Sequence, residues 1–105
     1  MKQAPMHLSP EARRWWRAVV TEYELEPHKL NLLTLAATAW DRSEQARLIL
    51  AKEGIIAPDR YGAPRAHPAV AIERDSRLAF ARLVRELALE DDYAPDPRPP
   101  RIGGR

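Results

Sequence analysis

Three histidines, His7, His28 and His67, are the side chains of this sequence best suited to acid–base or metal chemistry. Each stands beside an expected helix boundary, and none belongs to an H-E-x-x-H pattern. The sequence also has no G-x-S-x-G pattern and no glycine-rich phosphate loop. A histidine at a helix boundary usually fixes the backbone by a hydrogen bond, and we expect this role for His67. These observations predict a non-catalytic protein with no metal site and no cofactor.

Two acidic residues, Asp41 and Glu44, lie one turn apart on an expected helix, a spacing that metal sites can use. No histidine stands near them, so ion pairs with Arg42 or Arg47 are the favoured interpretation. Glu44 and Arg47 also project into an apolar arc, where an unpaired charge would be costly to bury. They pair with each other or they mark the polar rim of a subunit interface, and we favour the interface.

Arginine makes up most of the 17 basic residues, although the net charge is only +2. Because a guanidinium group binds phosphate through two parallel hydrogen bonds, this composition favours an anionic partner. The candidate DNA-binding residues fall into two groups, one near each end of the chain. They are Arg13, Arg14 and Arg17 in the first group, and Arg74, Arg77 and Arg85 in the second.

Trp15 and Trp16 stand among the arginines of the first group, a combination that can stack on bases and bind phosphates. On a helix, however, both indoles project to the same side as Val19 and Val20, so we expect core packing instead. The second group has no acidic residue directly among its arginines. It is either a phosphate-binding stripe or a solvated polar face.

One long helix, from about Pro27 to Glu53, must organise the chain. Proline suits a first helical turn, and Gly54 suits the end of a helix. Its apolar residues cover well over half of its circumference, so it is central to a helical unit or also contacts a neighbouring subunit. The candidate residues for such a subunit interface are Leu32, Leu35, Ala39, Glu44 and Arg47.

Two further helices flank this one. The first begins at Ser9-Pro10-Glu11, with Ser9 as the N-cap, and the last begins at His67-Pro68. Between the central and last helices, a small β-hairpin around Gly62 and an ordered loop are both compatible with the residues. The last helix should bury one stripe, consisting of Ile72, Ser76, Ala79, Phe80, Leu83, Val84 and Leu87.

The sequence therefore predicts a mainly α fold, a three-helix unit with a long central helix. We expect residues 1–8 to form a flexible arm, residues 9–89 to form the helical domain, and residues 90–105 to form a disordered, proline-rich tail. The first eight residues have no apolar segment typical of a signal peptide. The absence of cysteine fits a reducing cytoplasm.

Several short segments together resemble a known family. They are Leu8-Ser9-Pro10-Glu11-Ala12, Trp15-Trp16, Tyr23-Glu24-Leu25, Ala39-Trp40-Asp41-Arg42, Glu53-Gly54, Asp59-Arg60-Tyr61-Gly62, Arg65-Ala66-His67-Pro68 and Glu86-Leu87. In order and spacing, over residues 8–89, they look like the small terminase subunits of the P27 type, found in tailed phages and prophages. The resemblance implies a subunit that binds double-stranded viral DNA, assembles into ring-like homo-oligomers and recruits the large terminase subunit, which supplies the ATPase and nuclease.

The resemblance also implies the cytoplasm of a bacterial host, but it offers no short motif from which DNA contacts could be transferred to this chain. The six arginines named above are therefore chosen by charge placement alone. A helical protein-interaction or regulatory module without DNA binding is the alternative, favoured by the near-neutral net charge. A helix-turn-helix factor fits less well, because the central helix is longer than such motifs need.

Overall fold

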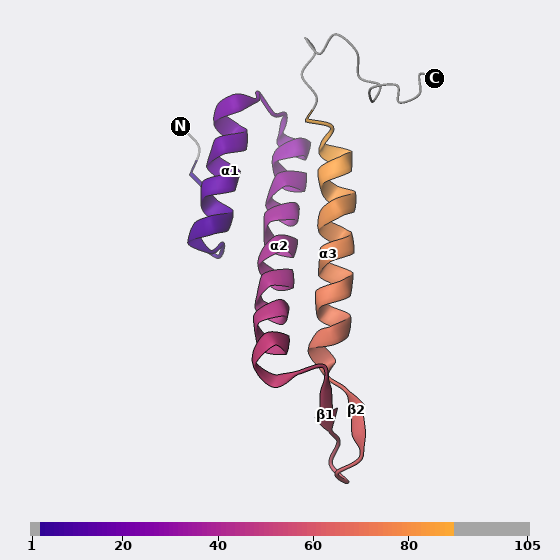
Figure 1. Cartoon of the computed structure of the whole chain (residues 1–105). Helices are drawn as coiled ribbons and strands as arrows, with labels where there is room; N and C mark the ends of the chain where they lie inside the picture. The colour runs from indigo at the N-terminus through magenta and orange to yellow at the C-terminus, as the bar shows by residue number, and fades with distance from the viewer. Residues whose placement is uncertain (1–2, 90–105) are drawn as a thin grey trace, which may run out of the picture.

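The computed structural model describes residues 3–89, which form three helices and one hairpin. The elements are α1 (Pro10–Glu22), α2 (Pro27–Glu53), β1 (Ile56–Pro58), β2 (Pro64–Ala66) and α3 (Pro68–Leu87). Figure 1 shows α2 between the other two helices, with α3 running along its length and α1 beside its first half only. The predicted mainly α fold is confirmed, with a hairpin between α2 and α3. The predicted tail, 90–105, lies outside the described residues.

Each helix begins with proline in its first turn, as the sequence indicated. The Ser9 side chain accepts a hydrogen bond from the Ala12 backbone N–H at 3.1 Å, which confirms Ser9 as the N-cap of α1. The α2 helix ends at Glu53, and the following residue, Gly54, has a φ of 84°, a conformation that side chains disfavour. The predicted helix boundaries therefore agree with the structure.

The histidine before α3 joins the ends of two helices. His67 Nδ1 accepts a hydrogen bond from the Ala69 N–H at 3.0 Å, so its Nε2 carries the proton and donates to Glu53 Oε1 at 2.7 Å. This confirms the expected backbone-fixing role of His67. It also connects the last turn of α2 to the first turn of α3 across the base of the hairpin.

The hydrophobic core lies where all three helices meet. Leu33 of α2 and Leu87 of α3 are fully buried, and Trp16 of α1 is only 4% exposed. Ala4 and Leu8 are buried in the same cluster, so the prediction of a flexible arm is wrong for residues 3–8. The reason is that this segment supplies apolar side chains to the core, while the His7 side chain bonds to Thr38 of α2.

The end of the helical unit near the hairpin has two helices rather than three, because α1 does not reach it (Figure 1). Of the stripe predicted for α3, Leu87 is buried and five other residues are half-buried. Ile72 is 49% exposed, so its predicted burial is wrong. Two packed helices cover only a narrow stripe of each other, which leaves Ile72 of α3 and Leu48 of α2 in contact with solvent.

Each strand of the hairpin carries a proline on its outer edge, Pro58 in β1 and Pro64 in β2. The Asp59 N–H donates to Ala63 O, and the His67 N–H donates to Ile55 O. Hydrogen-bonded and non-hydrogen-bonded residue pairs alternate along an antiparallel ladder, so Pro58 and Pro64 form a non-hydrogen-bonded pair, whose backbone nitrogens face away from the partner strand. Neither proline has an N–H to offer a further strand. This arrangement protects a projecting hairpin from edge-to-edge pairing.

Asp59 organises the turn of the hairpin. Its Oδ1 accepts from the backbone N–H groups of Ala63 and Tyr61, and its Oδ2 accepts from Arg65 Nε at 3.2 Å. The Ala63 and Tyr61 hydrogen bonds, followed by the Arg65 bond, lower the pKa of the Asp59 carboxyl below its ordinary 3.8.

Acidification should therefore loosen this turn at low pH only. Because the folded pKa is the lower one, the carboxylate contributes its full stabilisation above pH 3.8 and loses it as the pH falls through the lowered value. We expect the Tyr61 and Ala63 amide NMR signals to move together in that range. In Asp59→Asn the two signals should show no such titration, and an unchanged titration in this variant would contradict the assignment.

Candidate nucleic-acid interface

The arginines of α1 form one basic group on the outer side of that helix. Arg14 and Arg17 are exposed, and Arg13 is half-buried. None of the three forms an ion pair with another residue of the described segment 3–89. The charge of this group is therefore available to an anionic partner.

The positive charge of the α3 arginines is neutralised by acidic neighbours to a greater extent than the sequence suggested. Arg77 Nε lies 3.1 Å from Glu73 Oε2, one turn away, and Arg74 Nε lies 3.0 Å from Asp75 Oδ1. The expectation of no acidic residue among them overlooked these two neighbours on the same helix. Arg85 is exposed, with no ion pair to another described residue.

Sequence reasoning also missed Arg82, which is exposed on α3 near Arg85. At 100° per residue, Arg82 and Arg85 project about 60° apart on the helix, so both belong to one outward face. A helical projection of all arginines, rather than a search for one stripe, would have found it. The charge that remains free on α3 therefore lies in the second half of that helix.

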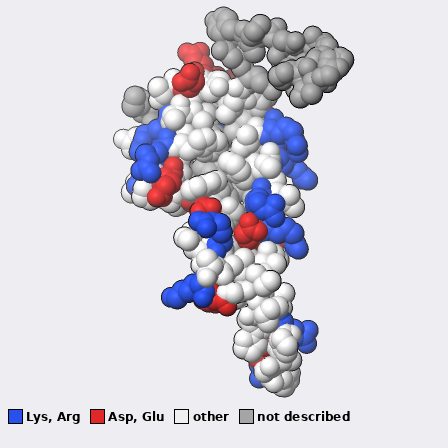
Figure 2. Space-filling model, in the orientation of Figure 1, with Lys and Arg blue, Asp and Glu red and all other residues white. Residues whose placement is uncertain are grey.

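The two basic groups do not meet. Figure 1 places α2 between α1 and α3, and Figure 2 shows basic side chains over α1 and over α3 with uncharged and acidic surface between them. The helices themselves touch through Trp15 and Phe80, whose ring centroids lie 5.7 Å apart. The six predicted arginines thus form two separate surfaces of one chain.

Both tryptophans of α1 face inward, as expected. Trp16 is buried, and its Nε1–H donates to Thr34 Oγ1 at 3.2 Å. Trp15 is half-buried and packs at a tilt of 59° against Phe80. Trp16 thus belongs to the core and Trp15 packs against it, in agreement with the predicted core packing.

The residues proposed for a subunit interface have different surroundings. Leu32 packs against the core, Ala39 is half-buried and Leu35 is 56% exposed. Glu44 and Arg47 pair with each other, with Arg47 Nη2 2.9 Å from Glu44 Oε1. The Arg47 hydrogen bond lowers the pKa of Glu44, and Glu44 raises the pKa of Arg47 in return.

Asp41 does not pair with arginine but holds the start of α1. Its Oδ2 accepts from the Ser9 backbone N–H at 2.8 Å, and its Oδ1 accepts from the Ser9 hydroxyl at 2.5 Å. The side chain is buried, with 7% of the residue exposed. Asp41 is thus a structural residue that positions the arginines of α1 relative to α2. No local pattern indicates a contact across 32 residues.

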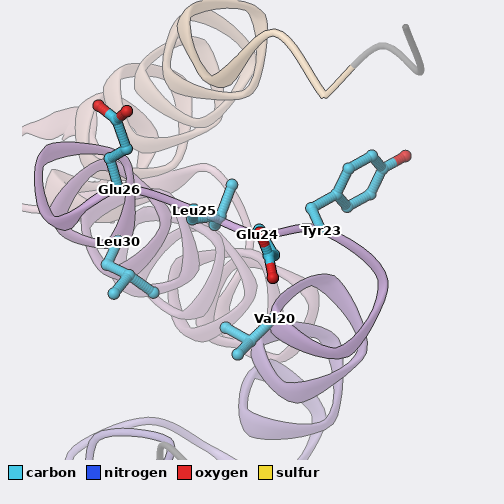
Figure 3. A pocket seen from close by; sticks show the side chains of 6 residues that line it. All are labelled: Val20, Tyr23, Glu24, Leu25, Glu26 and Leu30. Carbon is cyan, nitrogen blue, oxygen red and sulfur yellow. The ribbon is translucent and has the colours of Figure 1, made fainter.

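A hollow at the turn between α1 and α2, the turn pocket, has the wrong charge for phosphate. It is lined by Val20, Tyr23, Glu24, Leu25, Glu26 and Leu30. Figure 3 shows Val20 of α1 and Leu30 of α2 below the connecting turn in this view, with Tyr23 and Glu26 directed away from each other. Its carboxylates would repel a nucleic-acid backbone, so it is not part of the candidate interface.

The other polar residues with possible chemistry have ordinary structural partners. His7 Nε2 lies 2.8 Å from Thr38 Oγ1, and His28 Nδ1 lies 3.7 Å from Glu26 Oε1. Within residues 3–89, no set of three or more histidine or acidic side chains could hold a metal ion. Among the helices of this segment, none combines the length and hydrophobicity needed to span a bilayer.

The arrangement offers guanidinium groups on two outer faces of a helical unit, which can bind phosphates at fixed spacing. Compared with models of protein families, with curated proteins and with solved structures, the chain matches none.

Proposed function

We propose that this protein is a non-catalytic, DNA-binding subunit of a phage or prophage genome-packaging machine, similar to a small terminase subunit. The observation that supports DNA binding most directly is the α1 group, Arg13, Arg14 and Arg17. These arginines share one outer face and form no ion pair within the described residues. Duplex DNA bound there releases counterions from its phosphates.

The packaging role further requires self-association and a large terminase subunit as partner. Its support is the resemblance of residues 8–89 to the P27-type subunits, together with large apolar side chains exposed on both long helices. Those on α2 and α3 are Leu35, Leu48, Ile49, Ile72 and Leu78. Self-association would bury these side chains, so they are the residues at which contact with a second copy can be sought.

DNA binding can be tested with two variants that remove equal charge. We expect replacement of Arg13, Arg14 and Arg17 by alanine to weaken duplex binding and to reduce the slope of log affinity against log salt by up to about 3, one for each phosphate that the variant no longer binds. Replacement of Arg74, Arg77 and Arg85 should reduce the slope less, because two of these arginines already pair with carboxylates. Fluorescence anisotropy with a duplex at several salt concentrations measures both effects.

The matched α3 variant also separates this proposal from a protein-interaction module. That alternative is favoured by the ion pairs of Arg74 and Arg77, which neutralise much of α3. Equal reductions of the salt slope in the two variants would assign DNA binding to both basic groups rather than to the α1 group alone. No binding of the unchanged protein at low salt would overturn the proposal and favour the alternative.

A further inference from the structure

An aromatic groove crosses the helical unit where α1 and α3 meet over α2. It is lined by Glu11, Ala12, Trp15, Trp40 and Phe80 and has a volume of about 220 Å³. Small-molecule sites usually measure roughly 300–1,000 Å³, so this groove suits one or two side chains of a polypeptide. Among the described residues, neither Trp15 nor Trp40 has an acceptor for its indole N–H, whereas Trp16 does.

An acidic groove of about 270 Å³ continues from the aromatic groove and shares Glu11 and Trp40 with it. Its remaining lining residues are Ser9, Asp41, Glu44, Gln45 and Leu48. Glu11 is exposed and forms no ion pair with another described residue. Within residues 3–89, no lysine or arginine lines either groove. The joined surface therefore offers flat aromatic rings, free N–H donors and an unpaired carboxylate.

These features fit a proline-rich, basic segment. Such a segment favours the polyproline II conformation, in which its carbonyl groups remain unpaired and can accept indole N–H donors. Proline rings pack on aromatic side chains, and the segment loses little conformational freedom on binding. An arginine beside the prolines would meet the acidic groove.

The chain itself contains a segment of this chemistry. Residues 95–101 read Pro-Asp-Pro-Arg-Pro-Pro-Arg, which combines four prolines with Arg98 and Arg101. Phe80 lies seven residues before the end of α3, so the groove begins about 10 Å back along that helix. The eight residues from Leu89 to Pro97 span about 25 Å when extended as polyproline II, which is enough to reach it.

We propose that residues 95–101 bind in the aromatic and acidic grooves of the same chain, with proline rings on Trp15 and Trp40 and an arginine at Glu11. The complementary charge and the reach of the segment support this occupant. The bound segment would cover a surface between the two basic groups. This proposal does not depend on DNA binding.

The test uses the full chain and its three tryptophans. Their indole N–H groups give separate NMR signals, each assigned by a Trp→Phe substitution. We expect the double variant Arg98→Glu, Arg101→Glu to move the Trp15 and Trp40 signals by more than a linewidth. The Trp16 signal should stay, because this indole is buried and bonded to Thr34. The matched variant Lys52→Glu, Arg60→Glu makes the same charge change at exposed sites and should leave all three signals in place.

The remaining outcomes decide against the proposal. Unmoved Trp15 and Trp40 signals in the tail variant would show that the segment does not bind there. Equal movement of all three signals would indicate a general change of fold. If the signals of the unchanged protein move on dilution, the groove binds the tail of a second copy rather than its own.

Discussion

Shortening Leu33 to alanine should lower the free energy of unfolding by about 2–5 kcal/mol, the range for cavities created in packed cores. Leu33 is fully buried in the cluster that contains Trp16, Ala37 and Leu87. Because this cluster takes side chains from all three helices, the neighbours cannot close the cavity without moving a whole helix. Urea unfolding followed by helical circular dichroism measures the loss of stability.

The same substitution at Leu35 is a matched control on the same helix. Leu35 is 56% exposed, so Leu35→Ala should change the free energy of unfolding by no more than about 0.5 kcal/mol in the isolated chain. A change at Leu33 as small as that at Leu35 would contradict the core described here. A destabilisation at Leu35 that grows with protein concentration would show that a second copy covers this residue.

The sequence predicted the helices well because their boundaries are encoded locally. Proline in a first turn, a serine or histidine cap and a glycine stop each act through neighbouring residues only. Burial was harder to predict, because it depends on which helix covers which. Ile72 has the spacing of a core residue but lies beyond the reach of α1, and Ala4 and Leu8 pack although they precede any regular element.

The sequence named most arginines of the candidate site, although not Arg82, but it did not predict how the two groups are arranged. Charge type and helical spacing identified both arginine groups, because these depend on one helix at a time. Their separation by α2 and the remote anchor of Asp41 on Ser9 depend on tertiary packing. A single sequence specifies these only through the whole fold.

Replacing Asp41 by alanine should lower the free energy of unfolding by about 1.5–3 kcal/mol, the range for hydrogen bonds to a charged group. The buried carboxylate accepts both the N–H and the hydroxyl of Ser9, and the same hydroxyl caps α1 through Ala12. Without Asp41, the Ser9 N–H has no partner and the first turn of α1 is no longer attached to α2. The destabilisation should appear in thermal and urea unfolding, and Asp75→Ala, an exposed aspartate on α3, is its control.

A double-mutant cycle with Ser9→Ala identifies the cause. If Asp41 acts through Ser9, the two single effects on stability should not add, and the coupling energy should fall within about 0.5–3 kcal/mol. Ser9→Ala alone should lower the stability by about 0.5–2 kcal/mol, because it removes an N-cap. Strictly additive effects would show that Asp41 stabilises the protein by another route. Because Asp41 sets where α1 begins on α2, non-additive effects would also mean that this carboxylate fixes the position of Arg13, Arg14 and Arg17.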